Sequence, residues 1–313
     1  MRHEDAAAVC EVHSVTFLAQ ARKVRGEQAR PLRRTQASVL VSLEKDPAGC
    51  FVAEEAGSVI GCIMSRTWGS VGWFGTYAVL PEYQGQAVGK RLLAASLDYL
   101  RQDGDRVIGL ETMPESPYNL GLYLKLGFET RFLTLLLGKP LSDQAARAVE
   151  LPRWSEADIE TRERWLADLR QASGEICAGL DYSKEIQAAA RHSLGKTLLL
   201  TDQGKAVGCS LVNLVGPWEG RGPDWAQVGA LMLHPGHTGE GAFGALLEAS
   251  EALARAGGRE TLLLSVNGRH NWALERLLGW GYRVRGAMVR MVLRGTDEGP
   301  AVDGYVNLSR WMG

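Results

Sequence analysis

The short stretch Gln84–Lys90, with the sequence QGQAVGK, is the clearest candidate for a chemical role. It follows an apolar, aromatic-rich run that ends at Val79, and it leads into a helical pattern that starts near Ala87. Small residues let a backbone approach phosphate oxygens closely, and the unpaired N–H groups of a helix start attract negative charge. The pattern therefore predicts an anion site. A turn that only begins a helix explains the same residues, and the stretch alone leaves both interpretations open.

A second glycine-rich turn, Gly239–Gly244 with the sequence GEGAFG, has the spacing of a dinucleotide-binding fingerprint. That fingerprint needs an acidic residue about 20 positions later, at the end of the next strand, to bind the ribose. The next strand ends in LLLSVNG and supplies no acid. An internal repeat of the chain explains these glycines better than a dinucleotide site does.

This repeat divides the chain into two halves. Gly75–Ser96 aligns without gaps with Gly229–Ser250 at an offset of 154 residues, and a shorter match downstream keeps the same offset. An upstream match has an offset of 147, so the second half contains seven inserted residues, within Gly216–Trp225. The repeat predicts two domains, residues 1–143 (the first half) and residues 144–313 (the second half), joined by a polar stretch.

Both halves show the same order of predicted elements, which are two helices, a hairpin, a buried strand, a helix, a strand and a short helix. In the first half these elements and a final strand fall at 4–18, 35–45, 50–64, 73–79, 88–102, 107–112, 118–126 and 132–137. In the second half the longer ones fall at 156–172, 183–193, 197–214, 242–256 and 261–266. The expected fold class is α/β, an α+β mixed sheet with hairpins first and one strand–helix–strand crossover later. A strand-like pattern at 304–311 predicts a further strand in the tail.

The first turn and a downstream stretch together resemble the GNAT superfamily of N-acetyltransferases. Gln84, Ala87 and Gly89 occupy the defining places of its Gln/Arg-x-x-Gly-x-Gly/Ala signature, with Ala87 in place of the first glycine. Gly109–Phe128 resembles the second block of the family, a strand and a short helix that ends in Tyr-x-x-x-Gly-Phe. The resemblance covers nearly all of the first half. With the repeat, it implies two tandem acyl-CoA N-acyltransferase (GNAT) domains.

The resemblance implies that acetyl-CoA is the co-substrate. No metal is expected, because the six histidines show no metal-ligand spacing. The strand before the turn would hold the pantetheine arm, with the Val79 N–H as the oxyanion donor, and the turn would bind the pyrophosphate. Ser116 stands where many relatives have an asparagine that contacts CoA. The implied cofactor-binding residues are Tyr77, Ala78, Val79, Gln84, Gly85, Gln86, Ala87, Val88, Gly89, Lys90 and Ser116.

Acetyl transfer to an amine requires removal of the ammonium proton, stabilisation of the thioester oxygen, and a proton for the leaving thiolate. By resemblance, Tyr123 is the general acid at sulfur, and Glu111 is the candidate general base, acting through a water. Two plainer interpretations stay open: Tyr123 as a packed helix residue, and Glu111 as an exposed or salt-bridged strand residue. The alternative function is a non-catalytic module that senses acyl-CoA or binds a partner.

The second half lacks these residues. The offset of 154 places Thr238, Phe243, Ser265, His270 and Leu277 at the positions of Gln84, Gly89, Glu111, Ser116 and Tyr123. We therefore expect a degenerate copy, with activity in the first half alone. Seven of the nine tryptophans lie in the second half. Core packing is their favoured role, ahead of filling the former cofactor cleft or joining the domains.

The overall composition limits the classes of binding partner that we expect. A net charge of −1 with 45% hydrophobic residues indicates a globular chain and gives no case for nucleic acid or membrane binding. The chain shows no signal-peptide core, and its five cysteines form no C-x-x-C pair, which is typical of a cytoplasmic protein. The expected partners are a small-molecule or peptide amine acceptor, with the two domains packed on each other. The basic segment Ala21–Arg34 either borders the acceptor cleft or is a solvated loop.

Overall fold

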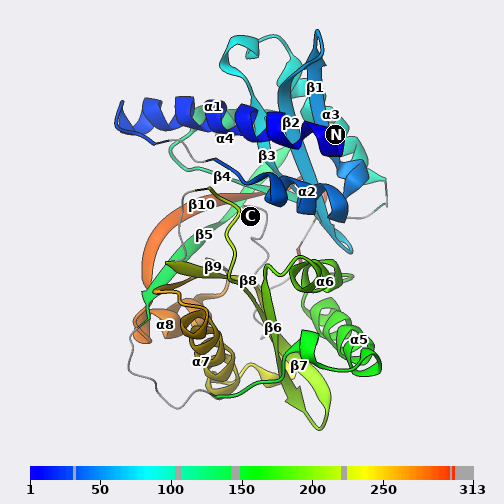
Figure 1. Ribbon diagram of the computed structural model, residues 1–313, viewed down its shortest axis with the longest axis vertical. Helices are drawn as coiled ribbons and strands as arrows, with labels where there is room; N and C mark the ends of the chain where they lie inside the picture. Colours follow the sequence, from blue (N-terminus) through cyan, green and yellow to red (C-terminus); the bar gives the residue numbers. More distant parts are fainter. Residues whose placement is uncertain are drawn as a thin grey trace.

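The computed structural model describes residues 1–30, 33–102, 104, 107–141, 149–219, 224–296 and 298–299. Within them, ten strands form one continuous sheet in the order β1-β2-β3-β4-β10-β5-β9-β8-β7-β6. Figure 1 shows this sheet running through the molecule, with the helices of the first half at one end and those of the second half at the other. The expected mixed α/β class is confirmed. The strand predicted at 304–311 lies outside the described residues, as does the middle of the predicted junction.

The first half contains two apolar layers, one on each face of its sheet. Its elements are α1 (Ala6–Arg25), α2 (Gln36–Lys45), β1 (Cys50–Glu55), β2 (Ser58–Trp68), β3 (Val71–Val79), α3 (Val88–Arg101), β4 (Val107–Thr112), α4 (Pro117–Lys125) and β5 (Phe128–Pro140). Helices α1 and α2 bury Val9 and Val39 against Cys62 on one face. Helices α3 and α4 cover the other face, where Leu93 packs with Phe74. Side chains that alternate along each strand supply both layers.

The second half repeats this architecture. Its elements are α5 (Ile159–Ile176), α6 (Ser183–Arg191), β6 (Gly195–Asp202), β7 (Lys205–Asn213), β8 (Trp225–Leu233), α7 (Glu240–Ala256), β9 (Thr261–Asn267), α8 (Asn271–Gly279) and β10 (Arg283–Leu293). A buried contact is repeated as well. The hydroxyl oxygens of Ser65 and Ser96 lie 2.8 Å apart in the first half, and those of Ser210 and Ser250 lie 2.8 Å apart in the second. A serine pair thus joins helix and strand in each half, although Ser65 and Ser210 occupy different positions of the repeat.

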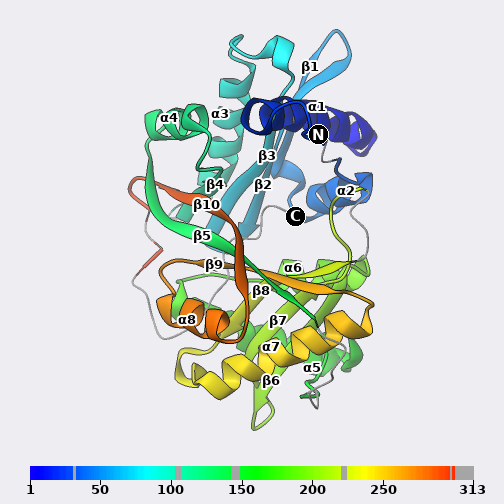
Figure 2. The ribbon, with the colours of Figure 1, turned by 90° about the vertical axis from the view of Figure 1, so that its left-hand side faces the viewer.

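The last strand of each half pairs with strands of the other half. β10 lies between β4 and β5, and β5 lies between β10 and β9 (Figure 2). Arg290 is opposite Glu111 where β10 runs antiparallel to β4, and Leu136 is opposite Ser265 where β5 runs antiparallel to β9. A bare strand edge exposes unpaired N–H and C=O groups. Each half thus depends on the final strand of the other to cover such an edge.

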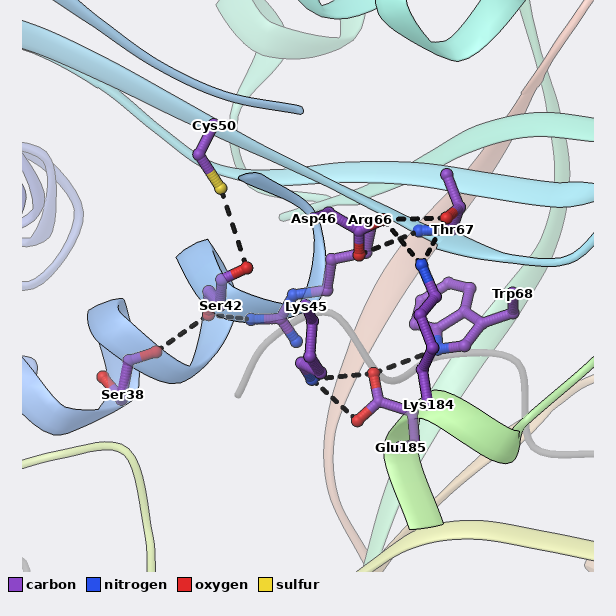
Figure 3. A network of polar contacts seen from close by, with 10 residues as sticks. All are labelled: Ser38, Ser42, Lys45, Asp46, Cys50, Arg66, Thr67, Trp68, Lys184 and Glu185. Atoms are coloured by element: carbon purple, nitrogen blue, oxygen red, sulfur yellow. Dashed lines mark hydrogen bonds and ion pairs between the residues drawn. The ribbon is translucent and has the colours of Figure 1, made fainter. Parts of the chain in front are cut away.

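Ion pairs join α2 and the residue after it to α6 (Figure 3). Lys45 Nζ lies 2.8 and 2.7 Å from the two carboxylate oxygens of Glu185, and Trp68 Nε1 donates to the same carboxylate at 3.1 Å. Lys184 Nζ lies 2.7 Å from Asp46 Oδ1. The side chains of Lys45 and Glu185 are only 10% and 16% exposed. This pair is therefore part of the buried contact between the halves.

Three further findings concern membrane-spanning helices, metal sites and cysteines. No helix in the described part of the chain is long and apolar enough to cross a membrane. Among the same residues, no group of three or more His, Cys, Asp or Glu side chains is placed to hold a metal ion. All five cysteines are free thiols, and four of them are buried.

We expect Lys45→Met to lower the free energy of unfolding by about 3 kcal/mol, because it removes the cation that lies 2.7 Å from the largely buried Glu185 carboxylate. The double variant Lys45→Met/Glu185→Met should recover most of this loss, since apolar side chains can replace a buried ion pair. Arg191→Met is the control. Its pair with Glu44 is exposed and contributes less than about 1 kcal/mol. Urea denaturation measures all three variants, and equal losses for Lys45→Met and Arg191→Met would contradict the argument from burial.

Candidate active site

Strands β3 and β4 pair over a short length and then separate. Their parallel pairs are Val71 with Val107, Gly72 with Ile108, and Trp73 with Gly109. β3 continues to Val79 and β4 to Thr112, and no further pair joins them among the described residues. The backbone of β3 beyond Phe74 thus presents an edge that can hydrogen-bond a ligand as an added strand would. Tyr77 and Ala78 lie on this open stretch, together with Val79.

Val79 directs its backbone N–H toward the opening. The Leu80 N–H donates to the Ile60 carbonyl on β2 at 3.0 Å. Because successive backbone groups of a strand point to opposite edges, the Val79 N–H points away from β2. The Val79 carbonyl accepts hydrogen bonds from the Thr16 hydroxyl at 3.2 Å and from the Gln84 amide at 2.9 Å. The Gln84 side chain therefore ties the glycine-rich turn to the end of β3.

A bulge in β3 accompanies the separation of the strands. The register against β2 shifts between Gly75 and Ala78, so Thr76 and Tyr77 together face one residue of β2. Thr76 has a φ of 48°, in the left-handed region that costs about 1–2 kcal/mol for a residue with a Cβ. Bulges often lie next to active sites, where they redirect a side chain. Here the Tyr77 side chain reaches the start of α3, next to Gly89.

The turn before α3 has the geometry of an anion site. Gly85 has a φ of 82°, Ala87 has a φ of 64°, and the helix begins at Val88. None of the N–H groups of Gly85–Lys90 donates a hydrogen bond to another described residue. The first turn of α3 contains no acidic side chain. Free N–H groups at the positive end of a helix dipole bind phosphate groups, so the turn fits the diphosphate of a nucleotide cofactor.

The packing of Tyr77 requires a glycine at position 89. A Cβ there would lie 2.1 Å from the Tyr77 hydroxyl oxygen and 3.2 Å from its Cζ. Burial of Tyr77 raises the pKa of its phenol to about 12. Gly89 therefore leaves room for the tyrosine and also keeps the backbone of the turn uncovered. The sequence signature indicated the second role but gave no sign of the first.

Tyr123 lies on α4, in the same apolar layer as α3. Its ring centroid is 5.9 Å from that of Phe74 and 6.2 Å from that of Phe128. Burial raises the pKa of Tyr123 well above its usual value, and the neighbouring Tyr77 raises it further. The phenol therefore keeps its proton at neutral pH, as a proton donor must. Ser116, buried at the N-cap of α4, makes no capping hydrogen bond through its side chain.

Glu111 lies in a buried network that the second half completes. Arg290 Nη1 on β10 is 3.2 Å from Glu111 Oε1, and the Thr134 hydroxyl on β5 donates to the same oxygen. Arg290 also donates to Glu298 through Nε and Nη2, and its guanidinium carbon lies 4.1 Å from the centroid of the Trp73 ring. Only 2% of the Glu111 side chain is exposed. Sequence reasoning missed Arg290, because no local pattern indicates that β10 lies beside β4.

The second half has lost the geometry of the anion turn. Helix α7 begins at Glu240, two positions earlier in the repeat than α3, and no residue of the preceding turn has a positive φ. Phe243, at the position of Gly89, is fully buried. Its ring centroid lies 5.3 Å from that of Trp272 and 5.5 Å from that of Trp280. These aromatic side chains fill the start of the helix, which fits a degenerate copy of the first half.

Known proteins are similar in sequence to the first half and similar in fold to the whole chain. A profile described as "Acetyltransferase (GNAT) family" matches residues 12–128. An acetyltransferase of Sodalis glossinidius (strain morsitans) is 31% identical over 117 residues, which are 37% of this chain and 82% of that protein. The structure of a putative acetyltransferase from Pyrococcus horikoshii has a TM-score of 0.67 at 17% identity, over 97% of this chain and 90% of the other. A tandem GNAT protein from the clavulanic acid biosynthesis pathway has a TM-score of 0.59 at 15% identity, over 96% and 98%.

We expect Ala87→Gly to raise the free energy of unfolding by about 0.5–1 kcal/mol. Glycine adopts a positive φ without strain, and this gain exceeds the entropy lost on ordering a glycine. Ala56→Gly is the matched control, because Ala56 has a φ of 49° in the exposed turn between β1 and β2, away from the site. Urea denaturation should show similar gains for both. A gain for Ala56→Gly with a loss for Ala87→Gly would contradict the left-handed geometry of the anion turn.

Proposed function

Because the chain belongs to the GNAT family of acetyltransferases, we propose that its first half transfers the acetyl group of acetyl-CoA to an amine of a small molecule or peptide by direct attack. One observation carries the proposal. The open edge of β3 and the left-handed turn before α3 are adjacent, and the Gln84 side chain joins them at 2.9 Å. An extended chain that ends in a diphosphate matches this pairing of an open strand edge with an anion site.

Acetyl-CoA supplies the acetyl group as a thioester. The N–H groups of Gly85–Lys90 bind the diphosphate, and the backbone of Tyr77–Val79 hydrogen-bonds the amides of the pantetheine arm. The Val79 N–H donates to the thioester oxygen as negative charge develops there. The Ser116 hydroxyl, which makes no helix-capping bond, is available to contact CoA.

Proton transfer involves one side chain on each face of the sheet. Tyr123 Oη, which stays protonated because burial raises its pKa, gives its proton to the leaving thiolate. Ile108 and Leu110 belong to the layer under α3 and α4, so Glu111, one position further, faces the opposite side. We assign Glu111 the role of general base through a water, with Arg290 and Thr134 holding its carboxylate in place.

The second half serves as a structural partner rather than a second enzyme. We assign residues 1–143 to the catalytic domain and residues 144–313 to a degenerate GNAT-like domain, which exchange their last strands, β5 and β10. Phe243 and its tryptophan neighbours occupy the turn that would bind the second diphosphate. The chain therefore binds one acetyl-CoA.

One observation favours a second candidate function, an acyl-CoA sensor or partner-binding module without turnover. The carboxylate of Glu111 is almost fully buried and is paired with Arg290, as in a structural ion pair. In that case acetyl-CoA would bind, but no amine would release CoA. Binding and turnover, measured on the same preparation, distinguish the two functions.

We expect calorimetric titration of the whole chain with acetyl-CoA to give one site per chain, and a panel of amines to reveal CoA release by at least one of them. Tyr123→Phe should keep the binding site and lower turnover about 10²-fold or more, because it removes the proton donor. Two sites would show that Phe243 does not block the second turn. The absence of binding would overturn the proposed function, and binding without CoA release would establish the sensor instead.

Glu111→Gln and Glu298→Gln form a matched pair, because each removes one carboxylate from the same buried guanidinium. Both should cost similar stability. If Glu111 is the base, Glu111→Gln lowers kcat by about 10²-fold or more, whereas Glu298→Gln leaves kcat per binding-competent site within about threefold of wild type. Activity is normalised to the number of acetyl-CoA sites found by calorimetry. Equal losses of kcat in the two variants would assign Glu111 a structural role only.

A further inference from the structure

A segment of the second half lies directly on the first half. Thr35 N–H donates to the Pro217 carbonyl at 2.9 Å, and Glu219 N–H donates to the Arg33 carbonyl at 2.8 Å. Arg34 and Trp218 form an antiparallel bridge between these two bonds. The segment belongs to the stretch where the second half has seven residues more than the first. In Figures 1 and 2 it rises in yellow-green from the second half to the start of α2.

This segment places Trp218 over a buried cation. The Arg34 guanidinium carbon lies 5.2 Å from the centroid of the Trp218 ring, and only 1% of Arg34 is exposed. The His13 ring of α1 lies 5.4 Å from the same tryptophan and stacks on Phe17 at 4.1 Å. Trp218 itself is half-buried. Part of the residue therefore packs on the first half, and part stays accessible to solvent.

Arg34 connects this contact to the opening between β3 and β4. Its Nη1 donates to the Thr76 hydroxyl at 2.8 Å, and both side chains are buried. Thr76 is the strained residue of the β3 bulge, directly before the open edge of Tyr77–Val79. Trp218 thus contacts Arg34, and Arg34 contacts Thr76, which directly precedes the backbone assigned to the thioester.

The face on which Trp218 lies is the one left for the amine. Helices α3 and α4, with the anion turn and Tyr123, cover the face from which acetyl-CoA binds. Glu111 faces the opposite side, where α1 and α2 pack. The residues just before α2, which Trp218 and its neighbours contact, lie on that same side of the sheet.

We propose that Trp218, supplied by the second half, is a specificity-determining residue that forms one wall of the acceptor site and selects amines with an aromatic or apolar group. The proposal rests on the proposed function of the first half. A planar apolar ring next to a buried guanidinium favours such a group over a second cation, because Arg34 repels positive charge. The same ring limits the access of water to the thioester.

The test compares Trp218→Ala with Trp280→Ala. The control removes a half-buried tryptophan of the same half, which packs on Phe243 near the start of α7. The probes are 2-phenylethylamine and ethanolamine, two monoamines that differ in their apolar group. For wild type we expect a higher kcat/KM with 2-phenylethylamine. Trp218→Ala should reduce this preference about tenfold, the scale of one aromatic contact, with the Kd for acetyl-CoA unchanged within about twofold.

A second readout needs no amine. Hydrolysis of acetyl-CoA by water alone should be about fivefold faster in Trp218→Ala than in Trp280→Ala, because the acceptor side is opened to water. Trp218→Phe should restore both properties, which separates loss of the ring from a general disturbance of the segment. Equal hydrolysis and unchanged amine preference in Trp218→Ala would overturn the proposal, as would a wild type that prefers ethanolamine. Failure of acetyl-CoA to bind wild type would instead overturn the proposed function.

Discussion

The separation of β3 from β4 after three residue pairs is the constraint on which the site depends. A Cβ at Gly109 would lie 2.4 Å from the Trp73 ring, so the last pair exists only because that position is a glycine. Beyond it, the bulge at Thr76 takes β3 away from β4, and the edge of Tyr77–Val79 stays open. An opening inside a sheet costs hydrogen bonds, and it persists only where the surrounding structure holds the strands apart.

The exchange of β5 and β10 supplies that surrounding structure. β10 covers the other edge of β4, so β4 is fixed from one side while its contact with β3 ends. The same strand carries Arg290 under Trp73 and against Glu111. The ion pairs between α2 and α6 then hold the two halves in register. The second half thus contributes a strand, a buried cation and the Trp218 segment to a site whose signature residues all lie in the first half.

The sequence predicted the positions of the helices and strands well, but it did not predict which strands pair across the two halves. Hydrophobic periodicity and turn residues predicted a helix at 88–102 and a strand at 107–112. The structure shows α3 at Val88–Arg101 and β4 at Val107–Thr112. The strand exchange left no such sign, because β5 and β10 are copies of each other and either could pair with β4 by local pattern. Arg290 depends on that long-range choice and was missed with it. The Gly-rich signature identified the anion turn, but the need of Tyr77 for a glycine at position 89 arises only from packing.

The two halves together show what the chemistry requires of the backbone. Two of the first-half residues that have a Cβ and a left-handed backbone lie at the site: Thr76 next to the open edge and Ala87 within the anion turn. The equivalent positions of the second half, Ala230 and Gly241, have no positive φ. Strain of this kind costs about 1–3 kcal/mol per residue and is retained where function needs it. In the second half the helix begins two residues earlier, and the Phe243 ring is part of the core. The second half therefore has apolar packing at the position where the first half has backbone strain.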